Sequence, residues 1–149
     1  MKLYLTRHGE AVAAEINPDR PLSALGEKQV NSVGEKLHAR GIVVDKIYHS
    51  GIVRARQTAE LLAPQVQAGS VLPLPGLRPE DLVEPMEIEV ATWTQPVMLV
   101  GHLPFMAYLL EALTLHSASV IFNPATVACL APVGDGWILE WVIHAAETR

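Results

Sequence analysis

Short apolar runs alternate with amphipathic stretches along most of this chain, and this alternation limits the possible folds more than any other feature. Runs typical of buried strands lie at residues 2–6, 42–49, 71–74 and 97–100. Between them, apolar side chains recur at the three- and four-residue spacing of helices. Strands that alternate with helices pair in parallel, because each helix carries the chain back along the sheet. The sequence therefore predicts a mainly parallel sheet with helices on both faces.

The expected helices have clear boundaries. Ser23 is placed to cap a helix that runs to about Arg40, and Gly41 is placed to end it. A second helix is expected over residues 53–63, before Pro64. Two more are expected around Met86, Val90 and Trp93 after a loop at 76–84, and from Pro104 onward.

The last part of the chain has a different pattern. Apolar stretches at 125–130 and 137–143 flank Gly134-Asp135-Gly136, which is typical of a β-hairpin. Pro73 places the strand at 71–74 on an edge of the sheet. We therefore predict an α/β fold, a three-layer α/β/α sandwich with a mainly parallel central sheet and an antiparallel C-terminal hairpin. A single domain is expected over residues 1–149.

Composition excludes several functional classes. A formal charge of −5 argues against binding to nucleic acid, which requires clustered cations. The apolar runs are too short to span a membrane, and the N-terminus lacks the pattern of a signal peptide. The lone Cys129 cannot form an internal disulfide, in agreement with a reducing cytoplasm. We expect a cytoplasmic protein that binds neither nucleic acid nor membranes.

Four residues that can carry chemistry follow strands of the predicted parallel sheet. Arg7 and His8 end the first strand, Arg54 lies in the first turn of the helix that follows the second strand, and His102 follows the strand at 97–100. Open α/β sheets bind their ligands at the carboxyl ends of the strands. The sequence therefore predicts that these four side chains converge at one edge.

The residue types favour phosphate chemistry. A neutral imidazole is a nucleophile, and a guanidinium binds phosphate oxygens in pairs. A cation at the start of a helix, such as Arg54, interacts unfavourably with the helix dipole, at a cost of about 0.3–1 kcal/mol in stability. A bound anion makes this interaction favourable. Each residue taken alone also has an ordinary explanation. Arg7 and Arg54 could be solvated surface cations. His8 could be a histidine hydrogen-bonded to the backbone, and His102 could cap a helix. The histidines lack the close spacing of metal ligands, so no metal is expected.

Several segments resemble the histidine phosphatase superfamily, in its phosphoglycerate-mutase-like branch. The signature of that family is similar to residues 5–10, Leu-Thr-Arg-His-Gly-Glu. Further likeness lies at residues 20–26, 50–59 and 100–104, in the family's order, with Gly51 where proline is common. The short chain and the stretch at 77–81 most resemble the small bacterial SixA-type phosphohistidine phosphatases.

The resemblance implies a role for each of the four residues and a phosphoglycerate-mutase-like fold. His8 would attack phosphorus and become transiently phosphorylated, while Arg7, Arg54 and His102 would hold the phosphate oxygens. No metal or other cofactor is implied. The implied substrate is phosphohistidine on a signalling or carrier protein, with a phosphate ion in the pocket as product. There are two alternatives. One is a phosphomonoesterase that hydrolyses a small phosphoester, and the other is a non-catalytic module that binds phosphate or a phosphoprotein.

The general acid is the least defined part of the prediction. Larger members of the family carry a glutamate for this role in a segment after the third strand, and that segment is short here. Glu80, Asp81 and Glu84 are the nearby carboxylates, and Asp81 is our candidate catalytic acid. Asp81 and Glu84 also have the spacing of a helix-capping box, so a purely structural role is the alternative.

Overall fold

The computed structural model describes residues 1–146, so residues 147–149 of the predicted domain lie outside the described residues. Within that range the chain forms six strands and four helices. In chain order they are β1 (Leu3–Arg7), α1 (Ala24–Ala39), β2 (Lys46–His49), α2 (Val53–Leu62), β3 (Ser70–Pro73), α3 (Glu84–Val90), β4 (Val97–Gly101), α4 (Phe105–Leu113), β5 (Val127–Val133) and β6 (Gly136–Ile143).

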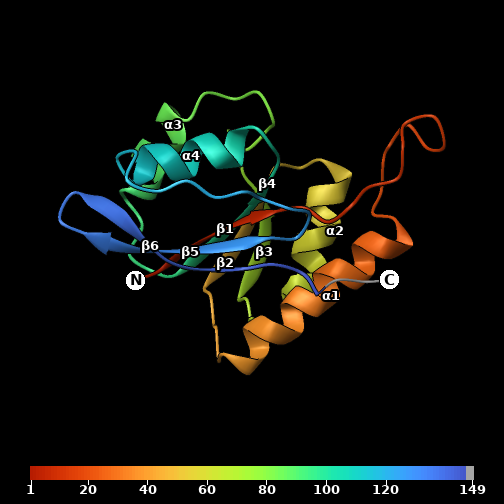
Figure 1. Ribbon diagram of the computed structural model, residues 1–149, viewed down its shortest axis with the longest axis horizontal. Helices are drawn as coiled ribbons and strands as arrows, with labels where there is room; N and C mark the ends of the chain where they lie inside the picture. Colours follow the sequence, from red (N-terminus) through yellow and green to blue (C-terminus); the bar gives the residue numbers. More distant parts are fainter. Residues whose placement is uncertain (147–149) are drawn as a thin grey trace.

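All six strands belong to one sheet, in the order β3-β2-β4-β1-β5-β6 (Figure 1). The first four strands in that order are parallel to one another, and β5 and β6 are antiparallel additions next to β1. This confirms the predicted parallel sheet, the C-terminal hairpin and the edge position of the proline-containing strand.

The two faces of the sheet are covered by different helices. Helices α1 and α2 lie on one face, and α3 and α4 lie on the other (Figure 1). Alternate residues of β1 serve the two cores: Tyr4 packs in the α1–α2 core, whereas Leu3 and Leu5 pack in the α3–α4 core. Burying each such side chain contributes roughly 1.5–3 kcal/mol. The predicted three-layer sandwich is therefore confirmed.

The start of α1 is pressed against the chain that follows β1. Ser23 Oγ accepts a hydrogen bond from Gly26 N at 3.0 Å, which confirms the predicted cap. A Cβ atom on Gly26 would lie only 2.0 Å from the carbonyl oxygen of Glu10. Glycine at this position therefore lets the helix approach the segment that leaves the end of β1.

We expect Gly26→Ala to lower both stability and activity, because the methyl group forces α1 away from the segment containing His8. The predicted loss is roughly 1–3 kcal/mol in the free energy of unfolding, measured by urea denaturation, together with a fall in kcat/KM. Gly41→Ala is the matched control, since Gly41 has φ +70° but no atom within 4 Å of its would-be Cβ. The control should lose stability only. Full activity in Gly26→Ala would contradict the proposed close packing.

Three predicted element boundaries are wrong. The second strand begins at Lys46 rather than at residue 42, because Val44 N donates to Val66 O outside the sheet. The first hairpin strand begins at Val127, since Ala125 has φ +67°, which an extended strand does not accommodate. Helix α3 ends at Val90, so Trp93 is not part of it.

None of the helices within residues 1–146 combines the length and apolar character that crossing a membrane requires.

Candidate active site

The parallel pairing of β1 with β4 brings His8 and His102 together. His8 N donates to Gly101 O at 3.1 Å, and the two imidazole centroids are 4.9 Å apart. His8 is 9% exposed and His102 is 1% exposed. The predicted convergence of these two histidines at the carboxyl edge is therefore observed.

His8 has one ring nitrogen bound and one free. Its Nδ1 lies 2.6 Å from Gly9 O, and a carbonyl oxygen only accepts, so Nδ1 carries the proton. The lone pair of Nε2 is then available as a nucleophile. Burial, with smaller contributions from the charges of Arg54, Arg7 and Arg20, lowers the pKa of His8 to about 4. The imidazole is consequently neutral at neutral pH, as nucleophilic attack requires.

Arg7 and Arg54 are cations with unused hydrogen-bonding capacity. Arg7 Nη1 donates to Phe122 O at 2.8 Å, while the Nε atoms of Arg7 and Arg54 are buried without a partner among the described residues. Burial lowers the pKa of both guanidiniums. Arg54 lies in the first turn of α2, where no acidic residue and no side-chain cap offset its charge. This arrangement favours a bound anion.

His102 does not act as a side-chain helix cap, the ordinary alternative for this residue. Its Nε2 lies 2.7 Å from Ser50 Oγ, and its Nδ1 is buried without a partner. Burial, and then the charges of His8, Arg54, Arg78 and Arg7, lower its pKa to about 3.

Most of the unpartnered buried atoms belong to candidate residues, two of which are arginines whose charges act on both histidines. Four buried side-chain polar atoms lack a partner within residues 1–146, and three of them belong to Arg7, Arg54 and His102. Buried polar groups are normally hydrogen-bonded, so such a concentration calls for an explanation. A tetrahedral oxyanion, which offers several acceptor oxygens, matches these donors.

The sequence analysis missed the residues that support the site. Thr58 Oγ1 accepts from Gly9 N at 3.1 Å and donates to Arg54 O at 2.8 Å, which ties β1 to α2. The charge of Arg20 acts on His8 and Arg54, and that of Arg78 acts on His102. Both arginines lie in stretches that resemble the family, Arg20 in residues 20–26 and Arg78 in residues 77–81, which was a usable signal for each.

The structure overturns the capping-box interpretation of Asp81. Helix α3 begins at Glu84 after Val83 and has no side-chain cap. Asp81 Oδ2 instead accepts from Arg78 N at 2.8 Å, so this carboxylate braces the loop after β3. Glu80 is exposed. A catalytic role for Asp81 stays a prediction.

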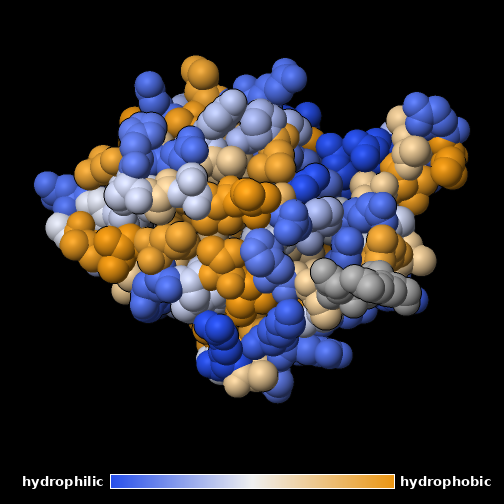
Figure 2. All heavy atoms as spheres, viewed as in Figure 1, coloured by the Kyte–Doolittle hydropathy of each residue, from blue (hydrophilic) through white to orange (hydrophobic). Residues whose placement is uncertain are grey.

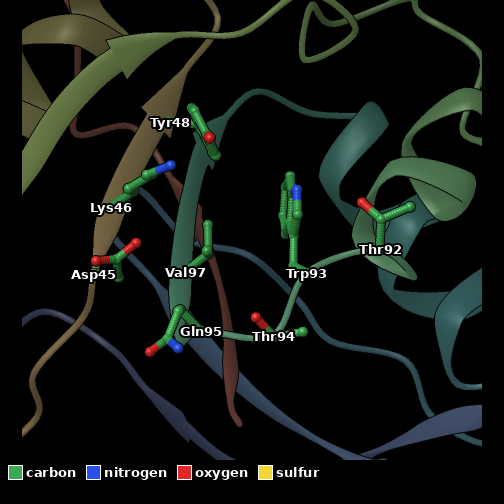
Figure 3. Close-up of a pocket in the computed structure, with 8 residues that line it drawn as sticks. All are labelled: Asp45, Lys46, Tyr48, Thr92, Trp93, Thr94, Gln95 and Val97. Carbon is green, nitrogen blue, oxygen red and sulfur yellow. The ribbon is translucent and has the colours of Figure 1, made fainter.

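A separate hollow lies near the starts of β2 and β4, at the sheet edge opposite to His8 and His102 (Figure 3). Tyr48 and Trp93 stack there with ring centroids 5.4 Å apart. None of the four candidate residues lines this hollow.

The model of the histidine phosphatase superfamily (branch 1) matches residues 3–82 of this chain. The chain belongs to the histidine phosphatase superfamily. It is an enzyme of that superfamily, a phosphatase of the SixA-like kind. The matched segment contains Arg7, His8 and Arg54, and His102 lies beyond it.

Relatives cover nearly all of the chain. A phosphohistidine phosphatase SixA homologue of Haemophilus influenzae is 29% identical over 164 residues, covering 99% of this chain and 96% of the relative. A putative phosphohistidine phosphatase SixA from Agrobacterium tumefaciens has a TM-score of 0.80 at 26% identity, covering 97% of this chain and 98% of that one. The protein histidine phosphatase SixA complexed with tungstate has a TM-score of 0.88, covers 97% of each chain and, at 22% identity, shows the shared fold.

We expect the stability of the phosphate-free protein to fall as the pH is lowered from about 6.5 to about 4. The folded-state pKa values of His8 and His102 lie below the ordinary 6.5, so within this window the unfolded chain binds more protons. Stability therefore rises with pH there, by up to about 1.4 kcal/mol per pH unit for each histidine. Urea denaturation across this range measures the slope.

Two variants check the origin of this pH dependence, one as the test and one as its control. His8→Asn combined with His102→Asn should flatten the dependence, whereas His38→Gln, at an exposed histidine, should leave it unchanged. An equally steep slope in the double variant would contradict the assignment to the two buried rings.

Proposed function

We propose that this enzyme removes the phosphoryl group from phosphohistidine on a signalling or carrier protein through a phosphorylated His8. The observation that carries the proposal is the free Nε2 of a neutral His8 beside the unpartnered donors of Arg7, Arg54 and His102. A nucleophile and an oxyanion-binding set in one buried place are what phosphoryl transfer requires.

The proposed reaction has two steps. His8 Nε2 attacks phosphorus in line, a bond from nitrogen to phosphorus forms, and the bond from phosphorus to the leaving imidazole nitrogen of the substrate breaks. That nitrogen takes up a proton from solvent. A water molecule then attacks the phosphorus of phosphoryl-His8: a bond from oxygen to phosphorus forms, and the bond from phosphorus to His8 Nε2 breaks. The protons of the water stay on inorganic phosphate or pass to solvent, and neutral His8 is restored. In both steps Arg7, Arg54 and His102 hold the equatorial oxygens and offset the charge of the transition state.

Similar proteins support a phosphate-like ligand. The similar SixA structure holds tungstate, and a similar mycobacterial glucosyl-3-phosphoglycerate phosphatase structure is a complex with VO3. The relatives named as phosphohistidine phosphatases favour a phosphohistidine substrate for this chain as well. We therefore propose that the pocket binds the phosphoryl group of a phosphorylated protein.

The segment after β3 supports a substrate with an easily protonated leaving group. One oxygen of Asp81 is engaged by the backbone of Arg78, which limits this carboxylate as an acid. The imidazole nitrogen of phosphohistidine is protonated more readily than the alcohol oxygen of an ester. A phosphohistidine substrate therefore depends less on Asp81 or Glu80 than a phosphate ester does.

The test compares three substrates: a phosphorylated histidine phosphotransfer domain, p-nitrophenyl phosphate and 3-phosphoglycerate. We expect preferential release of phosphate from the protein, with no release by His8→Ala and with little change in Asp81→Asn. Preference for the small esters, lost in Asp81→Asn, would identify a phosphomonoesterase in which Asp81 is the acid. Phosphate binding without turnover of any substrate would identify a binding module.

A further inference from the structure

The two ring nitrogens of His102 have different surroundings. Nε2 lies 2.7 Å from Ser50 Oγ, whereas Nδ1 is buried without a partner among the described residues. The ring itself is 1% exposed, and its centroid is 4.9 Å from that of His8. The nitrogen left to meet a bound phosphoryl group is therefore Nδ1.

Ser50 links His102 to the start of α2. Ser50 is 7% exposed, and its Oγ accepts a hydrogen bond from Ile52 N at 3.2 Å. A hydroxyl group has one proton to donate and two lone pairs. With one lone pair used by Ile52, the remaining question is whether Ser50 donates to His102 Nε2 or accepts from it.

Only one of these arrangements uses the hydroxyl proton of Ser50 and leaves Nδ1 as a donor for a phosphate oxygen. If Nε2 carried the ring proton and donated to Ser50, the hydroxyl proton would have no other acceptor within residues 1–146. Nδ1 would then present a lone pair to the phosphate oxygens, which also carry lone pairs. If Ser50 donates to Nε2, its hydroxyl both donates and accepts a hydrogen bond, and Nδ1 of His102 carries the ring proton.

We propose that Ser50 is a positioning residue that holds neutral His102 in the tautomer with its proton on Nδ1, so that His102 donates to an oxygen of the phosphoryl group. The inference rests on the proposed function, because it assigns one of the donors used in that reaction. His8 and His102 then share one tautomer but use opposite nitrogens: His8 attacks with the free Nε2, and His102 donates from Nδ1.

The direct test reads the tautomer without any substrate. Ring ¹⁵N NMR of the phosphate-free protein at neutral pH distinguishes a protonated ring nitrogen from a bare one. We expect His102 to show a protonated Nδ1 and a bare Nε2 in the native protein. In Ser50→Ala, a mixture with the proton on Nε2 is expected, and Ser50→Thr should restore the native spectrum. Thr58→Val is the matched control, because it removes a buried hydroxyl of the same site whose hydrogen bonds go to Gly9 and Arg54.

A kinetic cycle gives a second readout. Ser50→Ala should lower kcat by roughly tenfold, less than the roughly 10²–10³-fold loss when a transition-state donor is removed. In a His102→Ala background, Ser50→Ala should cause little further loss, since the residue acts through His102. Inorganic phosphate binding to each variant, measured by calorimetry, shows whether the pocket is still formed.

Two results would overturn the proposal. One is a native His102 with its proton on Nε2, and the other is an equal loss of kcat from Ser50→Ala with and without His102. Both are independent of the proposed substrate, because the NMR experiment needs none and the cycle uses whichever substrate is turned over. If the enzyme hydrolyses phosphohistidine but His102 carries its proton on Nε2, only the role of Ser50 is rejected. If His102 carries its proton on Nδ1 but the enzyme does not hydrolyse phosphohistidine, only the proposed substrate is rejected.

Discussion

Replacing His8 with alanine is expected to lower kcat by roughly 10⁴-fold or more. His8 is the neutral group with a free lone pair at the centre of the site, and without it the proposed phosphoenzyme cannot form. The measurement is steady-state release of phosphate from the phosphorylated phosphotransfer domain. The unpartnered donors of Arg7, Arg54 and His102 remain, so His8→Ala should still bind inorganic phosphate.

The control for this variant is His116→Gln, at an exposed histidine away from the site, which should keep native turnover. A folded, phosphate-binding His8→Ala protein that retains more than a few per cent of native kcat would contradict the assignment of His8 as nucleophile.

The second large effect is expected at Arg54, where activity and stability should change in opposite directions. Arg54→Ala removes a guanidinium that would hold transition-state oxygens, so kcat/KM should fall by roughly 10²–10³-fold. The same change removes a cation from the start of α2, where no acid offsets it, and from the neighbourhood of Arg20. The phosphate-free protein should therefore become more stable, by up to about 1 kcal/mol.

Arg56→Ala is the matched control for Arg54→Ala. Arg56 lies two residues further along α2, is exposed and pairs with Glu60. Its loss should leave kcat/KM unchanged and alter stability by only a few tenths of a kcal/mol. Inorganic phosphate should raise the unfolding temperature of the native and Arg56→Ala proteins more than that of Arg54→Ala. Equal kcat/KM losses in the two variants would show that Arg54 acts only as part of a general positive field.

The regular elements, and the residues that they place, were predictable from the sequence. His8 and His102 each follow a parallel strand, so the pattern of strands and helices placed both at the carboxyl ends of the sheet. The direct pairing of β1 with β4, which brings the two rings together, comes from the structure. The helical spacing of apolar residues after β2 likewise placed Arg54 in the first turn of α2. The space-filling view shows polar and apolar side chains side by side on the visible face (Figure 2).

The irregular segments were not predictable, because long-range contacts determine their course. Arg20 has φ +47° and donates from Nε to Val12 O, neither of which a local pattern indicates. Asp81 had the spacing of a helix cap, but its carboxylate pairs with the backbone of Arg78, in the loop before the helix. The hydroxyl of Ser50 meets a histidine 52 positions away, and only the folded sheet brings the two together.

The most direct test of the central claim is a rapid-quench experiment. Its substrate is a histidine phosphotransfer domain that carries ³²P on its phosphohistidine. During turnover we expect a transient, acid-labile and alkali-stable phosphate on the enzyme, located on the peptide that contains His8 and missing from His8→Ala. The labelled intermediate should form and decay at rates that allow the observed kcat. Turnover of the domain with no label on His8 at any time would contradict the account.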